Sequence, residues 1–333
     1  MENLKVRIMK ERNIGNKTAD LYLRNLRILK KKLDGKAFDG ELDWLDKYDE
    51  LKEILMKEKP NTRKTRLASI VVALKLDDDD NKKLIEKYSD LMYSSIKEYN
   101  DFIKQNKKTD YQKENWASLE DLKKVWNVLK REVYADNLHK PSKKIADKSE
   151  KEVLQKWLVA SLYILTKPRR NRDYALMKVI NENDYKDLSD NERDSNNYLV
   201  FKNNKDMYFS IGDFKTNNYQ ENGKMKKTGI DIEKIPPKLK QVIRMWRKFN
   251  GDKKHLIINN RGQRMSANSL TKYLMKIFAK TGKKKISSTM LRHIFITENP
   301  KLKEYRKHKK EAEQIADSMG HSLEEQQNYA KDN

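Results

Sequence analysis

The sequence predicts a mainly α-helical protein with a small antiparallel β-sheet, an α+β fold organised in two domains. Over most of the chain, apolar residues recur every three or four positions, which is the period of a helix with one buried face. Three short runs, 198–201, 207–211 and 228–232, instead have the length and the flanking turn residues of strands. A polar stretch at 104–115 separates the two parts.

The first domain is expected to span residues 1–75 and to be helical. Asn16 or Thr18 can cap a helix that Gly35 ends, because short polar side chains favour helix starts and glycine favours the residue after a helix. The apolar residues that follow predict a further helical pair, which ends at Pro60.

The next predicted helix has three cations in its first turn. Asn61 or Thr62 would cap it, and Arg63, Lys64 and Arg66 follow. Cations at a helix N-terminus oppose the helix dipole, and a bound phosphate would remove that conflict. We therefore predict that these three side chains contact DNA; a solvated basic turn is the alternative.

Residues 76–115 are predicted to hold one helix and the linker. The four consecutive carboxylates at 77–80 suit a solvated loop, since consecutive positions do not share a helix face. A helical pattern then runs to about residue 103, and the polar linker follows. The second domain is expected to span 116–333 and to open with a capping box made by Ser118 and Asp121.

The second domain is predicted to set its strands between helices. A strongly apolar helix covers 153–166, and Asn-rich turns separate the three strand-like runs. Further helices are expected at 238–249, 267–281, 287–298 and 302–319.

The composition points to a polyanionic partner. Lys and Arg number 74 against 50 Asp and Glu, giving a net charge of +24, which favours nucleic acid, here double-stranded DNA, over a membrane surface as the polyanionic partner. There is no cysteine, the N-terminus is too charged for a secretory signal, and no apolar run is long enough for a membrane span. We expect an intracellular protein with no membrane partner, no metal and no cofactor.

The segment 167–174 gathers cations suited to phosphate chemistry. Directly after the apolar helix come Lys167, Pro168 and then three arginines within four positions: Arg169, Arg170 and Arg172. Phosphoryl transfer needs positioned cations around the phosphate, and the planar guanidinium binds two phosphate oxygens at once. We predict that this segment binds phosphate.

Four segments, in order, resemble the conserved boxes of the tyrosine recombinases, the phage-integrase family. Residues 166–177 resemble the first arginine box, with Arg170 three positions before Asp173 and Arg169 as the alternative. Residues 288–295 resemble the His-x-x-Arg-His box around Arg292, and 319–322 resemble Leu-Gly-His-Ser. Tyr329 follows at the nucleophile's place, and Lys215 resembles the hairpin lysine between the boxes.

The resemblance covers roughly residues 116–333, and residues 1–75 are similar to the family's helical core-binding domain. It implies a two-domain clamp around DNA, acting as a homo-tetramer on two duplexes, with a monomer possible when free. The Lys-rich composition and the double arginine resemble the divergent integrases of virophages and large DNA viruses. That subfamily implies viral genome integration, with the protein found in the host nucleus, the cytoplasm or a viral factory.

The resemblance also implies the role of each residue. Tyr329 would attack the scissile phosphate to form a 3′-phosphotyrosyl bond, while Arg170 and Arg292 hold the non-bridging oxygens. Lys215 would protonate the leaving 5′-oxygen, with Lys226 or Lys227 as alternatives. His321 would bind the phosphate or orient the nucleophile.

Three features depart from the family pattern. Thr289 replaces the first histidine of the second box and cannot act as a base; the neighbouring His293 is expected to pack rather than react. The interval from His321 to Tyr329 is one residue shorter than usual. Only four residues follow Tyr329, so we expect either another assembly contact or a natural chain that continues.

Two other functions remain open on the sequence. A type IB-like DNA topoisomerase would use nearly the same residues, and a DNA-binding scaffold that has lost catalysis would explain Thr289. Outside the boxes, Lys283, Lys284 and Lys285 form a basic loop that either contacts DNA phosphate or is solvated. With Lys167 and Arg172, these lysines complete the predicted DNA contacts.

Overall fold

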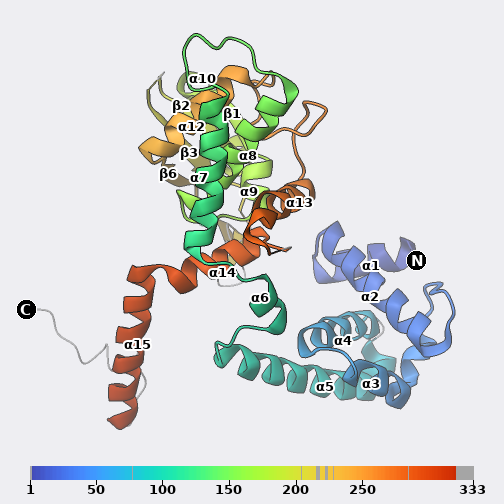
Figure 1. The fold of residues 1–333 in the computed structure, drawn as a ribbon. Helices are drawn as coiled ribbons and strands as arrows, with labels where there is room; N and C mark the ends of the chain where they lie inside the picture. Colours follow the sequence, from blue (N-terminus) through green and yellow to red (C-terminus); the bar gives the residue numbers. More distant parts are fainter. Residues whose placement is uncertain are drawn as a thin grey trace, which may run out of the picture. The chain divides into compact units, whose positions relative to one another are not determined.

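The computed structural model describes residues 2–76, 78–203, 205–214, 218–221, 224–227, 229–283 and 285–319. Its chain divides into two compact units, Met1–Lys108 and Thr109–Asn333 (Figure 1).

The first unit is helical. Its described elements are α1 (Glu2–Arg12), α2 (Asn16–Asp34), the 3-10 helix η1 (Asp43–Asp46), α3 (Tyr48–Met56), α4 (Pro60–Leu74) and α5 (Asp78–Lys104). The predicted helix that Gly35 ends is confirmed: α2 buries Leu23, Leu26 and Leu29, and Gly35 ends it at a φ of 74°, but its N-cap is Gly15 rather than Asn16 or Thr18. This left-handed conformation is one that glycine adopts without strain.

The first unit extends beyond residue 75, where the first domain was expected to end. Helix α5 packs against α4, and it contributes Ile85 and Tyr88 to the same hydrophobic core. The hydroxyl of Tyr88 also donates to the carbonyl of Leu45 at 2.7 Å. Helix α5 begins at Asp78, so the backbone of most of the expected acidic loop is helical.

The second unit is mostly helical as well. Its described helices are α6 (Asp110–Asn115), α7 (Leu119–Ala135), α8 (Lys148–Ile164), α9 (Asn171–Ala175), α10 (Glu182–Lys186), α11 (Asp190–Asp194), α12 (Pro237–Phe249), α13 (Ala267–Phe278), η2 (Ala279–Thr281), α14 (Ser288–Glu298) and α15 (Pro300–Ser318). The predicted capping box before α7 is confirmed: the Asp121 amide donates to Ser118 Oγ, and the Ser118 amide donates to Asp121.

The strands of this unit form a mixed sheet, which corrects the predicted antiparallel one. The strands are β1 (Lys178–Asn181), β2 (Asn197–Phe201), β3 (Met207–Ile211), β4 (Asn218–Glu221), β5 (Lys224–Lys227) and β6 (Asp231–Lys234). The main sheet has the order β1-β2-β3-β6. Strand β1, which was not predicted, pairs parallel with β2, while β2, β3 and β6 are antiparallel. Strands β4 and β5 form a separate two-stranded hairpin.

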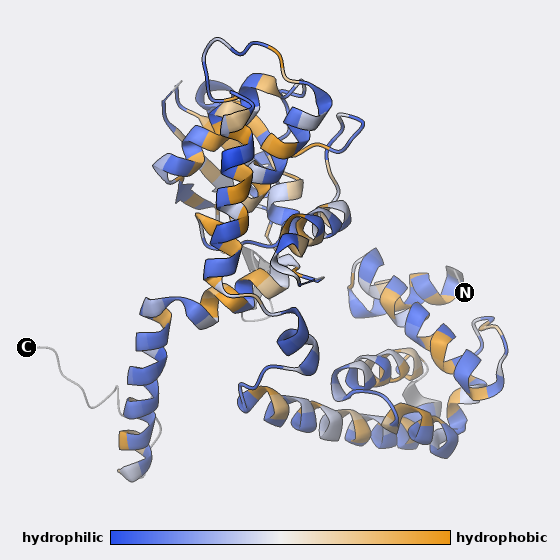
Figure 2. Ribbon diagram, in the orientation of Figure 1, coloured by the Kyte–Doolittle hydropathy of each residue, from blue (hydrophilic) through white to orange (hydrophobic). Residues whose placement is uncertain are grey.

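A single large hydrophobic cluster joins the helices and the sheet of the second unit. Helix α8 packs against α7 and α12, and the cluster includes Trp157, Phe209 and Trp246, which are fully or almost fully buried. Helix α15 differs from these helices, because Ala316 is its one buried residue and its surface is mostly hydrophilic (Figure 2). Within the described ranges, no helix combines the length and the apolar character that crossing a bilayer requires.

Candidate functional site

The cation-rich segment, residues 167–173, covers the turn after α8 and the first three residues of α9. We call this segment the arginine turn. Helix α8 ends at Ile164, and Pro168 is buried. Arg170 is the residue that caps the start of α9, with a φ of −69° and a ψ of 150°, and its carbonyl accepts from the amide of Asp173 at 3.0 Å. Helix α9 has only five residues, so its dipole adds little to phosphate binding.

Buried hydrogen bonds fix the arginine turn to the helices around it. The hydroxyl of Tyr163, on α8, donates to Asn171 Oδ1 at 2.6 Å. Asn171 Nδ2 in turn donates to Thr271 Oγ1 on α13, also at 2.6 Å. Burial raises the pKa of Tyr163 well above its usual range, so this phenol stays a hydrogen-bond donor. The turn is thus held rigidly where α8, α9 and α13 meet.

Arg169, the alternative site residue, is occupied by carboxylates. Its guanidinium pairs with Asp173 at 3.7 Å, with Glu233 at 2.7 Å and with Asp231, and its side chain is 14% exposed. Burial works to lower the pKa of Arg169, but the hydrogen bond and charge of Glu233 and the charge of Asp231 outweigh it and raise the pKa. A guanidinium with three carboxylate partners is already neutralised, and so it is poorly suited to binding a phosphate.

Arg172 also pairs with a carboxylate, but at the surface. Its guanidinium donates to Asp213 at 2.8 Å, and its side chain is 55% exposed. The buried Asn197 supports this contact from β2: its amide group donates to the carbonyls of Asp213 and Asp173, and its Oδ1 accepts from the Asp213 amide at 2.9 Å. Asn197 and Asp213 were not singled out on the sequence, where nothing marks them.

Arg170 lies close enough to Arg292 for their charges to interact, although the two are far apart in the chain. Arg292 projects from α14, and burial together with the positive charge of Arg170 lowers its pKa, against an opposing effect of Asp173. Both arginines are partly buried. Among the ion pairs of the described residues, none includes Arg170 or Arg292. The structure therefore brings together the two arginines that the sequence placed in separate boxes.

Thr289 and His293 flank Arg292 on α14. The Thr289 hydroxyl accepts a hydrogen bond from Arg292 Nη2 at 3.3 Å, so this side chain orients the guanidinium from one turn away. His293 was expected to pack, but it is exposed, because the buried face of α14 is formed by Met290, Leu291 and Ile294.

Several predicted site residues lie outside the described residues. These are Lys215, Lys284, His321 and Tyr329, and the side chains of Lys226 and Lys227 are likewise outside. Their roles stay predictions.

In the first unit, two of the predicted DNA contacts have internal partners. Arg63, which is 3% exposed, pairs with Glu98 on α5, and Arg66 pairs with Glu58 after α3. The ammonium of Lys64 lies 4.1 Å from the ring centroid of Tyr99, a cation–π distance. Packing of α4 against α5 and α3 thus gives Arg63 and Arg66 a structural reason that does not involve DNA, and their DNA contact stays a prediction.

The other predicted DNA contacts that the structure describes are exposed or partly exposed side chains of the second unit. Lys167 and Lys285 are exposed, and Lys283 is half-buried. The Lys285 ammonium lies 5.8 Å from the ring of Tyr111, and its backbone amide donates to Asn115 Oδ1.

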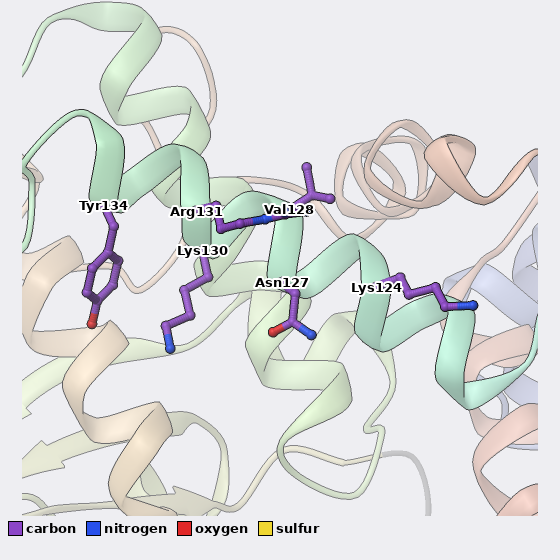
Figure 3. Close-up of a pocket in the computed structure, with 6 residues that line it drawn as sticks. All are labelled: Lys124, Asn127, Val128, Lys130, Arg131 and Tyr134. Carbon is purple, nitrogen blue, oxygen red and sulfur yellow. The ribbon is translucent and has the colours of Figure 1, made fainter.

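A hollow in the second unit lies away from the arginine turn. It measures about 790 Å³ and is lined from α7 by Lys124, Asn127, Val128, Lys130, Arg131 and Tyr134 (Figure 3). None of the predicted site residues lines it, and a phosphate-binding surface needs no deep pocket, so volume is a poor guide to the site here. No three His, Asp or Glu side chains in the described ranges are grouped as metal ligands would be.

Comparison with known proteins gave no match: no protein-family model, no curated protein and no solved structure matches this chain.

Proposed function

We propose that this protein is a site-specific DNA recombinase or integrase that cleaves and rejoins DNA through a 3′-phosphotyrosyl intermediate. The observation that carries the proposal is the electrostatic interaction between Arg170 and Arg292. The positive charge of Arg170 lowers the pKa of Arg292, and the charge of Asp173 opposes that effect; a bound anion would favour the charged form of both arginines. A DNA phosphate, whose charge grows at its non-bridging oxygens during transfer, is such an anion.

The chemistry divides among the remaining proposed residues. The Tyr329 phenol gives its proton to water, its oxygen forms a bond to phosphorus as the bond from phosphorus to the 5′-oxygen breaks, and Lys215 supplies the proton that the leaving oxygen takes. His321 binds the phosphate or orients the tyrosine. Thr289 cannot accept the phenol proton, but its hydrogen bond to Arg292 gives it a role in holding that guanidinium. The net charge of +24 favours the approach to double-stranded DNA, and assembly as a tetramer on two duplexes belongs to the same proposal.

Trapping the covalent intermediate tests this proposal directly. Because the target site is unknown, the substrate is a pool of nicked duplexes with a randomised recognition sequence, in which loss of a short fragment after cleavage prevents rejoining. The wild-type protein should form a denaturant-resistant adduct without added metal, and sequencing the captured DNA then defines the target. Tyr329→Phe should form no adduct while binding the selected duplex with nearly unchanged affinity.

The outcomes separate the competing functions. An adduct that survives Tyr329→Phe would refute the proposed nucleophile. No adduct from the wild-type protein, together with tight and salt-sensitive binding, would refute cleavage and favour a DNA-binding scaffold. A Tyr329-dependent adduct on one duplex, with relaxation of supercoiled DNA and no strand exchange, would favour a topoisomerase over a recombinase.

A further inference from the structure

The chain enters the second unit through the short helix α6, which lies close to α14 (Figure 1). The first unit ends at Lys108, and α6 begins two residues later, behind a capping box. Residues 109–116 are called the junction segment below. Their side chains bind both ends of residues 285–298, called the α14 segment, which contains α14 and therefore Arg292.

The start of the α14 segment is bound through its backbone. The Lys285 amide donates to Asn115 Oδ1 at 3.0 Å, and the Lys285 carbonyl accepts from the Tyr111 hydroxyl at 3.4 Å. Asn115 is 2% exposed, and its Nδ2 donates to the Tyr111 carbonyl at 3.0 Å, which fixes the orientation of the amide group. Ile286 is fully buried. The chain is therefore held immediately before Ser287, which caps α14.

The end of the α14 segment is bound through a carboxylate. Glu298, the last residue of α14, accepts from Trp116 Nε1 at 2.9 Å and, through its other oxygen, from the Leu119 amide at 2.7 Å. Leu119 is the first residue of α7, where the helix dipole favours a negative charge. Trp116 also packs against the hydrophobic core of the unit. Asn115 and Trp116, neighbours in the chain, thus bind opposite ends of the α14 segment.

Hydrogen bonds at both ends restrict α14 in a way that apolar packing does not. Met290, Leu291 and Ile294 bury one face of the helix, but the hydrophobic effect is not directional. Hydrogen bonds weaken steeply when their angles are distorted, so these contacts oppose movement of α14 along its axis and around it. A misplacement of about 1 Å can reduce a reaction rate about 100-fold, and the restriction therefore matters at Arg292.

We propose that the junction segment positions Arg292 for phosphate binding, with Asn115 and Trp116 as positioning residues. This inference rests on the proposed function. Neither residue contacts the phosphate, and each acts through one end of the α14 segment. Arg170 is held separately, because the hydrogen bonds of its neighbour Asn171 fix the arginine turn to α8 and α13. The junction segment should consequently act on Arg292 and not on Arg170.

Removal of one indole N–H tests this role with little change in packing. Trp116→Phe keeps an aromatic ring against the core and removes the donor to Glu298. In single-turnover assays on the selected duplex, it should slow adduct formation by about tenfold or more, within the loss that a small misplacement causes. DNA affinity should stay within about threefold of wild type, since the phosphate contacts remain. Glu298→Gln, which keeps one acceptor oxygen, should slow adduct formation less than Glu298→Ala.

Trp126→Phe is the matched control. Trp126 also packs at the edge of the same core, and its Nε1 donates to Ser161 Oγ at 2.7 Å. That partner lies on α8 and not on α14. Both substitutions remove one side-chain hydrogen bond, so their unfolding midpoints should be similar. The adduct rate of Trp126→Phe should nevertheless stay close to that of wild type.

Double substitutions show on which arginine the junction segment acts. Substitutions that affect one shared interaction are not additive. In the Arg292→Ala protein, Trp116→Phe should slow adduct formation by less than about twofold further, because no guanidinium is left to position. In the Arg170→Ala protein it should retain most of its effect. Equal further losses in both arginine variants, or an equal loss from Trp126→Phe, would overturn the inference and leave the proposed function intact.

Hydrogen exchange provides a readout that does not depend on DNA cleavage. The backbone amides of α14 should exchange faster in Trp116→Phe than in wild type, because local opening becomes easier when one end of the helix is released. Trp126→Phe should leave their exchange unchanged. Equal exchange in wild type and Trp116→Phe would overturn the inference. A wild-type protein that forms no adduct would instead refute the proposed function, and with it the role of Arg292 that the inference requires.

Discussion

Arg169 and Arg170 are neighbours in the chain with opposite environments. The guanidinium of Arg169 is shared among Asp173, Asp231 and Glu233, whereas Arg170 takes part in no ion pair within the described ranges and its charge lowers the pKa of another cation, Arg292. On the sequence alone both fitted the first box. The partners that separate them lie some sixty residues further along the chain, on β6, and only the folded structure brings them to Arg169.

This contrast predicts different consequences for the two substitutions. Arg170→Ala should leave the free energy of unfolding nearly unchanged and abolish most adduct formation. Arg169→Met leaves three carboxylates without their cation and should destabilise the protein, toward the lower end of the about 3–5 kcal/mol expected for breaking a buried pair, because Asp231 is half exposed. Urea unfolding of both variants measures this. Similar losses of stability from the two variants would contradict the assignment.

Glu58 predicts a dependence of stability on pH in the first unit. The hydrogen bond from Lys32 and the charge of Arg66 lower the pKa of Glu58 below its ordinary 4.5, against the opposing effect of burial. A carboxyl with a lowered folded-state pKa contributes stability above its unfolded pKa and loses it as the pH falls through the folded value. The urea concentration at the unfolding midpoint of the wild-type protein should therefore decrease as the pH is lowered below 4.5. Glu58→Gln should be less stable at pH 7 and show a shallower decline. An unchanged decline would show that Glu58 is not responsible.

At the scale of elements, local sequence patterns predicted the helices, but they predicted only part of the sheet. Gly35, Ser118 and Asp121 marked helix boundaries that the structure confirms, because capping depends on residues close in sequence. Strand β1 has four residues and carries no such mark. Its parallel pairing with β2 is a long-range contact, so the sequence could not reveal that the sheet is mixed.

The same distinction applies to the candidate site. Arg170 and Arg292 were recognisable from their sequence boxes, and the structure adds that their charges interact. The internal partners of Arg63 and Arg66, Glu98 and Glu58, were not foreseen. A basic helical turn has the same sequence whether its cations face solvent, phosphate or a buried carboxylate, and packing between helices decides among them.

Gly212, the first residue after β3, is predicted to tolerate no larger residue. A Cβ at Gly212 would lie 2.1 Å from the Arg193 carbonyl oxygen, and Gly212 directly follows Ile211, which is held by the pairing of β3 with β6. Gly212→Ala should lower stability by about 1–3 kcal/mol or more, the usual cost of overpacking. Gly251→Ala is the matched control, since a Cβ there meets nothing within 4 Å. Thermal unfolding compares the two; equal midpoints would contradict the close contact.

For the whole molecule, the net charge of +24 is a prediction about DNA affinity and its response to salt. Arg63, Arg66 and Arg169 pair with internal carboxylates, so we expect these three cations to contribute little to DNA binding. A protein that makes six to ten phosphate contacts loses about 10³–10⁵ in affinity between 50 and 200 mM salt. Fluorescence anisotropy with the Tyr329→Phe protein, which cannot cleave, should show a loss in this range.

Single substitutions then show which cations contribute to the salt dependence of DNA binding. Lys285→Ala, at an exposed lysine, should weaken binding to all duplexes alike and reduce the slope of log affinity against log salt by about one, as expected for a residue on a phosphate. Arg63→Met should leave that slope unchanged, because the Arg63 guanidinium pairs with Glu98. This expectation concerns the slope alone and not the stability of the variant. A slope that falls with Arg63→Met and not with Lys285→Ala would mean that Arg63 leaves Glu98 to bind DNA, and would favour the predicted phosphate contact of α4.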